Sequence, residues 1–176
     1  RRAVAFTLAA HQLRRPVTVE NTDEQPLPFG FGTHPYFRVP AEGDWNVTVP
    51  ASTYWPLEAM LPTGEQLPID PPRDLRSGRP FADTKLDDVL GELAFENGLC
   101  ITQLENSKTS ERIVQTFDEK FRECVVYTPP HREAICIEPY TCVPTAAELG
   151  TKGISAGWQS LASGEKWQST IEITYE

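Results

Sequence analysis

Short segments in which polar and apolar residues alternate recur along most of this chain, and they restrict its possible folds more than any other feature. These segments are rich in Val, Ile, Thr and aromatic residues, and turn residues from among 16 prolines and 11 glycines separate them. The predicted strands are residues 3–8, 17–20, 45–49, 99–104, 111–117, 123–128, 134–137 and 169–175. Only residues 145–149 are expected to form a helical turn, because no segment keeps a helical period for three turns. The sequence therefore predicts an all-β protein, built as an antiparallel β-sandwich or barrel.

The length of the chain favours one domain. Its 176 residues are enough for a hydrophobic core, and no linker-like segment divides them, so we expect a single domain over residues 1–176. Residues 56–83 are the least regular part, with a turn predicted at 61–65 and an extended loop at 70–73. A loop of this length inside a compact domain usually covers or forms a functional site.

Composition and charge exclude several classes of partner. The chain has 39% apolar residues and a formal net charge of −9, and its basic pairs are only Arg1-Arg2 and Arg14-Arg15. These features argue against nucleic acid and against an anionic membrane surface, and the apolar runs are too short to cross a bilayer. The four cysteines form no CxxC pair. They are expected to be buried or half-buried free thiols in a reducing compartment such as the cytoplasm.

Two segments that lie 104 positions apart carry the most distinctive titratable residues. His34 follows Gly30 and Gly32 and precedes a proline, and Glu138 follows a run of apolar residues and also precedes a proline. An imidazole can give or take a proton near neutral pH, and a carboxylate leaving a buried strand has a raised pKa that suits a general base. We interpret the two as a candidate acid and base. Each has a structural alternative, namely a histidine that bonds a neighbouring loop and a glutamate that is exposed at the end of a strand.

The adjacent carboxylates Asp87 and Asp88 form a further candidate site. They are a weak signal for a metal, because no other ligand lies near them in the sequence. They suit the hydroxyls of a polyol better, since each carboxylate accepts two or more hydrogen bonds, although they could also cap a short turn. Several aromatic residues, Tyr36 and Tyr140 among them, could stack against a sugar ring, although most aromatic residues pack in a core or at its rim. Motifs for nucleotide binding, α/β-hydrolases and zincins do not occur.

Taken together and in order, these segments resemble the aldose 1-epimerase (galactose mutarotase) family over nearly the whole chain. The segments that carry the resemblance are residues 21–22 with 29–37, then 61–65, 85–90, 137–142 and 161–165. The resemblance implies a galactose mutarotase-like antiparallel β-sandwich that binds a free sugar in an open cleft. It also implies that Glu138 takes the proton from the anomeric hydroxyl, that His34 protonates the ring oxygen, and that no cofactor or metal is required. Asp87 is the implied sugar-binding carboxylate, and Tyr36 and Asp88 are predicted to assist it.

The family is considerably longer than this chain, so the resemblance implies a C-terminal portion that lacks the N-terminal strands. For such a portion alone we expect reduced or absent activity and self-association through exposed sheet edges. One alternative is a hexose-6-phosphate 1-epimerase, for which the candidate phosphate ligands are Arg38, Arg73, Arg76 and Arg79. The other alternative is a carbohydrate-binding module that keeps the cleft without the chemistry.

Overall fold

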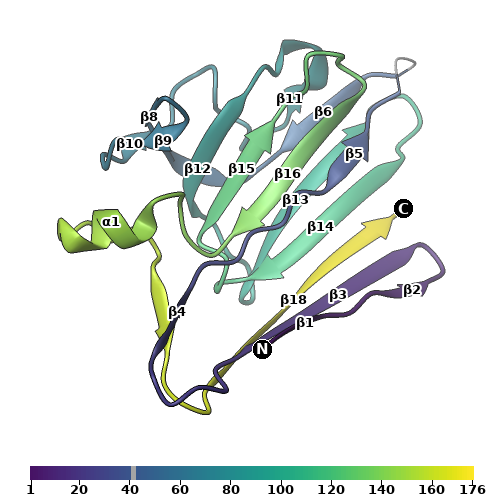
Figure 1. Ribbon diagram of the computed structural model, residues 1–176. Coiled ribbons are helices and arrows are strands. Elements are labelled where there is room, and N and C mark those ends of the chain that lie inside the picture. Colours follow the sequence, from purple (N-terminus) through teal and green to yellow (C-terminus); the bar gives the residue numbers. More distant parts are fainter. Residues whose placement is uncertain (41–42) are drawn as a thin grey trace.

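The computed structural model describes residues 1–40 and 43–176, and almost all of its regular structure is β (Figure 1). The paired strands are antiparallel throughout the two large sheets. This confirms the predicted all-β, antiparallel fold. The reason lies in the sequence, because alternating residues with β-branched and aromatic side chains fit a pleated surface that is buried on one side.

The first sheet has eight strands in the order β1-β3-β18-β14-β13-β6-β11, and β2 also pairs with β3. Its strands are β1 (Arg2–Val4), β2 (Thr7–Ala9), β3 (Gln12–Glu20), β6 (Trp45–Thr48), β11 (Arg79–Pro80), β13 (Leu99–Asn106), β14 (Arg112–Asp118) and β18 (Lys166–Tyr175). In Figure 1 the long strands β3 and β18 form its lower right part, where both termini lie.

The second sheet has six strands in the order β10-β7-β12-β15-β16-β5. Its strands are β5 (Tyr36–Arg38), β7 (Ala51–Trp55), β10 (Leu67–Pro68), β12 (Asp87–Leu93), β15 (Glu123–Tyr127) and β16 (Ala134–Tyr140). Two short pairs join β4 (Leu27–Phe29) to β17 (Gln159–Leu161) and β8 (Leu57–Glu58) to β9 (Leu61–Pro62). The helices are the 3-10 turn η1 (Phe81–Asp83) and α1 (Ala146–Thr151).

The main hydrophobic core lies between the two large sheets. Leu104 and Phe117 of the first sheet belong to the same buried cluster as Ile135 and Ile137 of the second. A buried side chain also joins the sheets, because Gln115 Nε2 donates a hydrogen bond of 3.1 Å to the carbonyl oxygen of Ile137. Each large apolar side chain buried in this way contributes about 1.5–3 kcal/mol. This layer therefore stabilises the second sheet and leaves its other face available for a site.

The predicted strands are present, with several differences in their limits. Residues 3–8 form two strands, β1 and β2, which pair with β3 in one register. The ladder is interrupted after Val4 because the residue opposite Ala5 is Pro16, which accepts a hydrogen bond from Ala5 N but has no N–H to donate. The turn predicted at 61–65 is also displaced, since Leu61–Pro62 is strand β9 and the chain reverses at Ala59 and Met60, which have φ values of 48° and 67°. Residues 56–83 hold four two-residue strands and η1. Outside residues 56–83 the structure also adds β4, β5, β7, β12 and β17, which the pattern did not predict.

The cysteines are free thiols, as predicted. Cys100, Cys124 and Cys136 are buried and Cys142 is partly buried. Burial raises the pKa of the Cys100 thiol to about 12 and that of Cys136 to about 11. In neutral solution both are therefore protonated and behave as small apolar groups.

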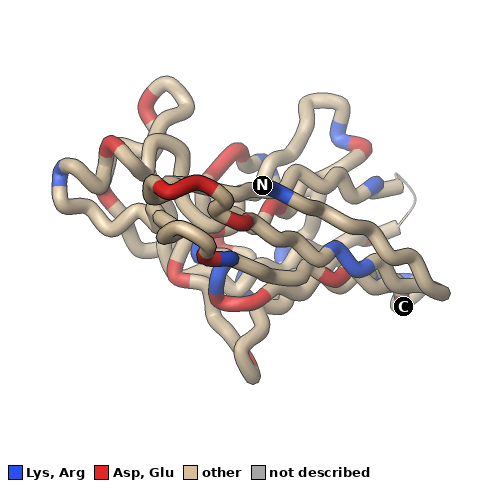
Figure 2. Tube along the Cα trace, turned by 60° about the horizontal axis from the view of Figure 1, so that its bottom comes forward, with Lys and Arg blue, Asp and Glu red and all other residues tan. Residues whose placement is uncertain are grey.

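Charge is distributed unevenly along the chain. Figure 2 shows Lys and Arg as short separate segments between more numerous Asp and Glu segments. None of the described helices has the length and hydropathy needed to cross a membrane. The expected absence of a nucleic-acid partner stays a prediction.

Candidate active site

The register of the six-stranded sheet brings the candidate residues together on the face opposite the core. Residues that are directly opposite in antiparallel strands lie on the same face of a sheet. One row across four strands consists of Asp87, Tyr127, Cys136 and Tyr36. The adjacent row consists of Val89, Val125 and Glu138. Segments that are far apart in sequence therefore present the carboxylates of Asp87 and Glu138, one thiol and two phenols to one surface.

His34 reaches this surface because its segment is fixed to the end of β16. Thr33 N donates to the carbonyl of Pro139 at 3.2 Å, and Gly32 forms a β-bridge with Tyr140. A Cβ at Gly32 would lie 2.8 Å from the ring of Tyr140, so the close approach requires glycine. Gly32 thus has a packing role, which brings the His34 segment close to β16.

The predicted acid and base are in contact. His34 Nε2 lies 3.3 Å from Glu138 Oε1, and the exposed fraction of the side chain is 50% for His34 and 2% for Glu138. Burial raises the pKa of Glu138, while the charge of His34 and a hydrogen bond from Tyr140 oppose that rise. The pair joins a buried carboxylate to an imidazole that faces solvent, which is an arrangement suited to proton transfer.

Tyr140 is a member of this group that the sequence did not assign to Glu138. Its hydroxyl donates to Glu138 Oε2 at 3.1 Å, and burial beside that carboxylate raises the pKa of Tyr140 to about 12. Tyr140 therefore stays a hydrogen-bond donor and fixes Oε2 of Glu138, while Oε1 of the same carboxylate faces His34. The sequence held a signal for this contact, because Glu138 and Tyr140 are two positions apart at the end of a predicted strand, and residues at this spacing lie on the same face of a strand.

Asp87 and Asp88 are adjacent in sequence but have different surroundings. Both line the cavity described below and both begin strand β12, so they do not cap a turn. Arg73 Nε donates to Asp88 Oδ1 at 2.8 Å, and Arg73 also pairs with Asp70 at 2.6 Å. Asp87 is exposed, although not completely. The part of its carboxylate that is buried, together with the charge of Asp88, raises its pKa. Asp87 is thus the carboxylate that remains available to a ligand, while Asp88 is bound to an arginine.

Tyr36, which is predicted to bind substrate, lies against His34. Its ring stacks on the His34 imidazole with a centroid distance of 5.0 Å, and the residue is 58% exposed. Tyr36 is not among the residues that line the cavity, whereas Tyr127, with its ring edge-on to His34 at 6.4 Å, is one of them. The structure therefore gives Tyr36 contact with the imidazole and places Tyr127 at the cavity.

These side chains surround a cavity of about 310 Å³. Its apolar part is formed by Leu57, Met60, Val89, Val125 and Pro144, and its polar part by His34, Asp87, Asp88, Tyr127, Glu138 and Tyr140. Leu57 and Met60 belong to the β8–β9 hairpin, so part of the irregular segment 56–83 does cover the site. No Lys or Arg is among the described residues that line it.

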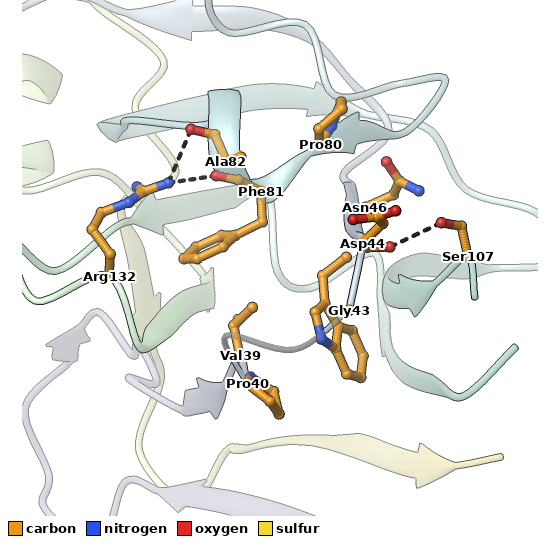
Figure 3. A pocket seen from close by; sticks show the side chains of 11 residues that line it. Val39, Pro40, Gly43, Asp44, Asn46, Pro80, Phe81, Ala82, Ser107 and Arg132 are labelled. Carbon is orange, nitrogen blue, oxygen red and sulfur yellow. Dashed lines mark hydrogen bonds between the residues drawn. The ribbon is translucent and has the colours of Figure 1, made fainter. Parts of the chain in front are cut away.

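A larger cavity of about 540 Å³ lies elsewhere, between Val39, Pro80, Phe81 and Asp44 (Figure 3). Arg132 at its border donates hydrogen bonds to the carbonyl oxygens of Phe81 and Ala82. The described residues around it include no pairing of an acid with a base that could exchange a proton, since an arginine stays charged. The larger cavity is therefore not the candidate active site.

Glu123 is a second buried carboxylate on the same face of the sheet. It is 3% exposed, and Trp55 Nε1 donates to its Oε2 at 3.0 Å. Burial raises its pKa to about 7, which the Trp55 hydrogen bond and Arg122 only partly oppose. It borders a separate cavity with Glu92 and Glu119 and does not line the cavity of His34 and Glu138.

Comparison with known proteins bears on the family and the fold. The family model described as aldose 1-epimerase matches residues 2–174. A solved galactose mutarotase-like protein from Clostridium acetobutylicum is similar with a TM-score of 0.86 and 20% identity, over 98% of this chain and 55% of that one. Another, from Lactobacillus casei, has a TM-score of 0.74 and 22% identity, over 98% of this chain and 62% of that one. The fold is therefore of the galactose mutarotase-like type, and this chain spans little more than half the length of these structures.

Proposed function

The chain belongs to the aldose 1-epimerase family, and from this we propose that it interconverts the α and β anomers of an unphosphorylated hexose. The observation that carries the proposal is the contact of 3.3 Å between His34 Nε2 and the buried carboxylate of Glu138, at a cavity of about 310 Å³. The reaction is an isomerisation, in which one proton is removed at one oxygen and one is added at another. A paired base and acid is what such chemistry needs.

In the proposed reaction Glu138 removes the proton of the anomeric hydroxyl. The electron pair of that O–H bond forms the C1 carbonyl, the bond between C1 and the ring oxygen breaks, and His34 gives its proton to the ring oxygen. Rotation about the C1–C2 bond and the reverse transfers then close the ring as the other anomer, so protons and electrons balance. Tyr140 keeps the carboxylate oriented through its hydrogen bond to Oε2, and Asp87 accepts hydrogen bonds from sugar hydroxyls.

The charge around the cavity favours an unphosphorylated sugar. The cavity presents the carboxylates of Asp87 and Glu138, while that of Asp88 is paired with Arg73. No Lys or Arg is among the described lining residues, so a phosphate dianion would meet like charge. Arg73, Arg76 and Arg79, which were considered as phosphate ligands, are bound to Asp70 and Asp88, to Asp74, and to backbone carbonyls. Arg38 is exposed on the edge strand β5 and does not line the cavity.

The test is NMR exchange spectroscopy with α-D-glucose and α-D-galactose, at a pH where spontaneous anomer exchange is slow. We expect the protein to accelerate exchange of at least one free hexose and to leave the 6-phosphate of that hexose at least ten-fold slower. Faster exchange of the phosphorylated sugar would favour the hexose-6-phosphate alternative. Perturbed sugar signals without exchange would favour a binding module, and neither exchange nor binding would refute the proposal.

Exchanging the two adjacent aspartates for asparagine is expected to give unequal effects. Asp87→Asn removes a charged acceptor from the sugar, and since hydrogen bonds to charged groups are worth about 1.5–3 kcal/mol, kcat/KM should fall by about 10-fold to 100-fold. Asp88→Asn should change it only a few-fold, because that carboxylate already pairs with Arg73. Steady-state exchange rates over a range of sugar concentrations measure both. Equal losses in the two variants would contradict the assignment of Asp87.

The outer strands also support the proposed association of two copies of the chain. Strands β1 and β11 end one sheet and β10 and β5 end the other, and Phe6 and Leu8 beside β1 are 65% and 81% exposed. Unpaired edges with exposed apolar residues favour pairing with a second chain. Equilibrium sedimentation should show a dimer or larger species, and a stable monomer at all concentrations would count against it.

A further inference from the structure

A third side chain stands beside the proposed acid and base. A ring nitrogen of His34, Sγ of Cys136 and a carboxylate oxygen of Glu138 all lie within 4.8 Å of one another. Cys136 and Glu138 are separated by one residue on β16, so both point to the same face of the sheet. They are held firmly, because β16 pairs along its length with β15 and also with β5. The epimerase chemistry proposed above makes no use of the thiol.

The three donors match the ligand preferences of zinc and cadmium. A thiolate, an imidazole and a carboxylate are the zinc ligands found in proteins, at bond lengths of about 2.0–2.3 Å. Tetrahedral geometry with such bonds places donor atoms about 3.3–3.8 Å apart, and Nε2 of His34 is already 3.3 Å from Glu138 Oε1. Calcium and magnesium prefer oxygen donors alone and fit this set poorly.

The surroundings leave room for an ion. His34 and Glu138 both line the cavity of about 310 Å³, so a water molecule could occupy the fourth coordination position. Tyr140 already bonds Glu138 Oε2, which leaves Oε1 free for a metal. Asp87 faces the same cavity and adds negative charge beside the ion.

We propose that His34, Cys136 and Glu138 form an inhibitory site for zinc or cadmium, which a metal ion occupies in place of the sugar. On binding, the thiol loses its proton to solvent, its sulfur lone pair forms the metal bond, and the lone pairs of Nε2 and Oε1 form two others. Neither His34 nor Glu138 can then transfer a proton. The binding half of the proposal stands on the three donors alone, and only the inhibition rests on the proposed function.

The test is titration of the metal-free protein with Cd²⁺, followed by the ultraviolet charge-transfer band between thiolate and cadmium, and with Zn²⁺ by calorimetry. Wild-type protein should bind one equivalent of each ion. Cys136→Ala should lose the band and bind Zn²⁺ at least ten-fold more weakly. Cys100→Ala is the matched control, because its thiol is equally buried but lies in β13, away from the site, and it should bind like wild type. Thermal unfolding of each variant verifies that it is folded.

The outcomes separate this proposal from the proposed function. A cadmium band of unchanged size in Cys136→Ala, or one lost equally in Cys100→Ala, overturns the metal site whatever the activity. Stoichiometric binding that depends on Cys136, in a protein that exchanges no sugar anomers when metal-free, keeps the site and refutes the epimerase. If both hold, micromolar Zn²⁺ should slow anomer exchange at least ten-fold in wild type, and a chelator should restore it.

Discussion

Replacing Glu138 by Gln should slow anomer exchange by about 10³-fold, since positioned acid–base groups contribute roughly 10²–10⁴-fold. Glutamine has the same shape and can still accept the hydrogen bond of Tyr140, which is 3.1 Å from Oε2 in the wild type. It cannot take a proton from a hydroxyl. Sugar binding should therefore persist with little change in KM, while kcat falls, which is the pattern expected when an interaction of the transition state is lost.

The matched control for this experiment is Glu123→Gln. Glu123 is a buried carboxylate on the same face of the sheet, one strand away, but it does not line the cavity with His34. Its substitution should leave exchange within a few-fold of wild type in the same NMR measurement. If Glu138→Gln keeps wild-type exchange, or if Glu123→Gln loses as much, then Glu138 is not the base.

The second large effect concerns stability, and it comes from Glu123. Burial raises its pKa to about 7 in the folded protein, from an ordinary value of 4.5. Between these values the folded state keeps a proton that the unfolded state has released, so the free energy of unfolding falls as the pH rises through this window. Above pH 7 the folded state bears the full cost of burying the charged carboxylate. The rise in pKa corresponds to about 3 kcal/mol of stability.

Glu123→Gln should remove that cost, because the amide is neutral at every pH and can still accept the hydrogen bond of Trp55 Nε1. The variant and the wild type should have similar stability near pH 5, and at pH 8 the variant should be more stable by about 3 kcal/mol. Urea unfolding at a series of pH values measures the difference. Glu119→Gln changes an exposed carboxylate at the same cavity and should leave the pH dependence as in wild type. An unchanged slope in Glu123→Gln would show that this carboxyl does not titrate as its burial implies.

The strands that could be predicted are those whose alternation is strong in the local sequence. In β18, Ile171 is buried in the core and Ile173 packs against it, while the polar residues Glu172 and Thr174 alternate with them, so the period of two is visible in the residues themselves. Strand β12 begins with Asp87 and Asp88 and was not recognised, because two carboxylates obscure any apolar alternation. It is a strand because β7 and β15 pair with it on both sides. Tertiary pairing outweighs local preference at such positions.

The candidate residues could be identified in the sequence, but the contacts between their side chains could not. His34, Glu138 and Asp87 stand out by context and by resemblance to a family, whereas the contact of Tyr140 with Glu138 and the binding of Asp88 by Arg73 depend on side-chain positions. The stacking of Tyr36 on His34 likewise depends on side-chain positions, and its role in substrate binding stays a prediction.

By itself, the sequence determined the antiparallel β architecture and the family and provided one candidate acid and one candidate base, since alternation, turn residues and short motifs are local properties. Only the tertiary structure decided that Asp87, Cys136, Glu138 and His34 share one surface, because the register of four strands and the docking of the segment before β5 set their distances. It also decided that Glu123 is buried beside Trp55 with a pKa near neutrality. Burial and the distance between remote side chains are properties of the folded arrangement, and no local stretch of sequence encodes them.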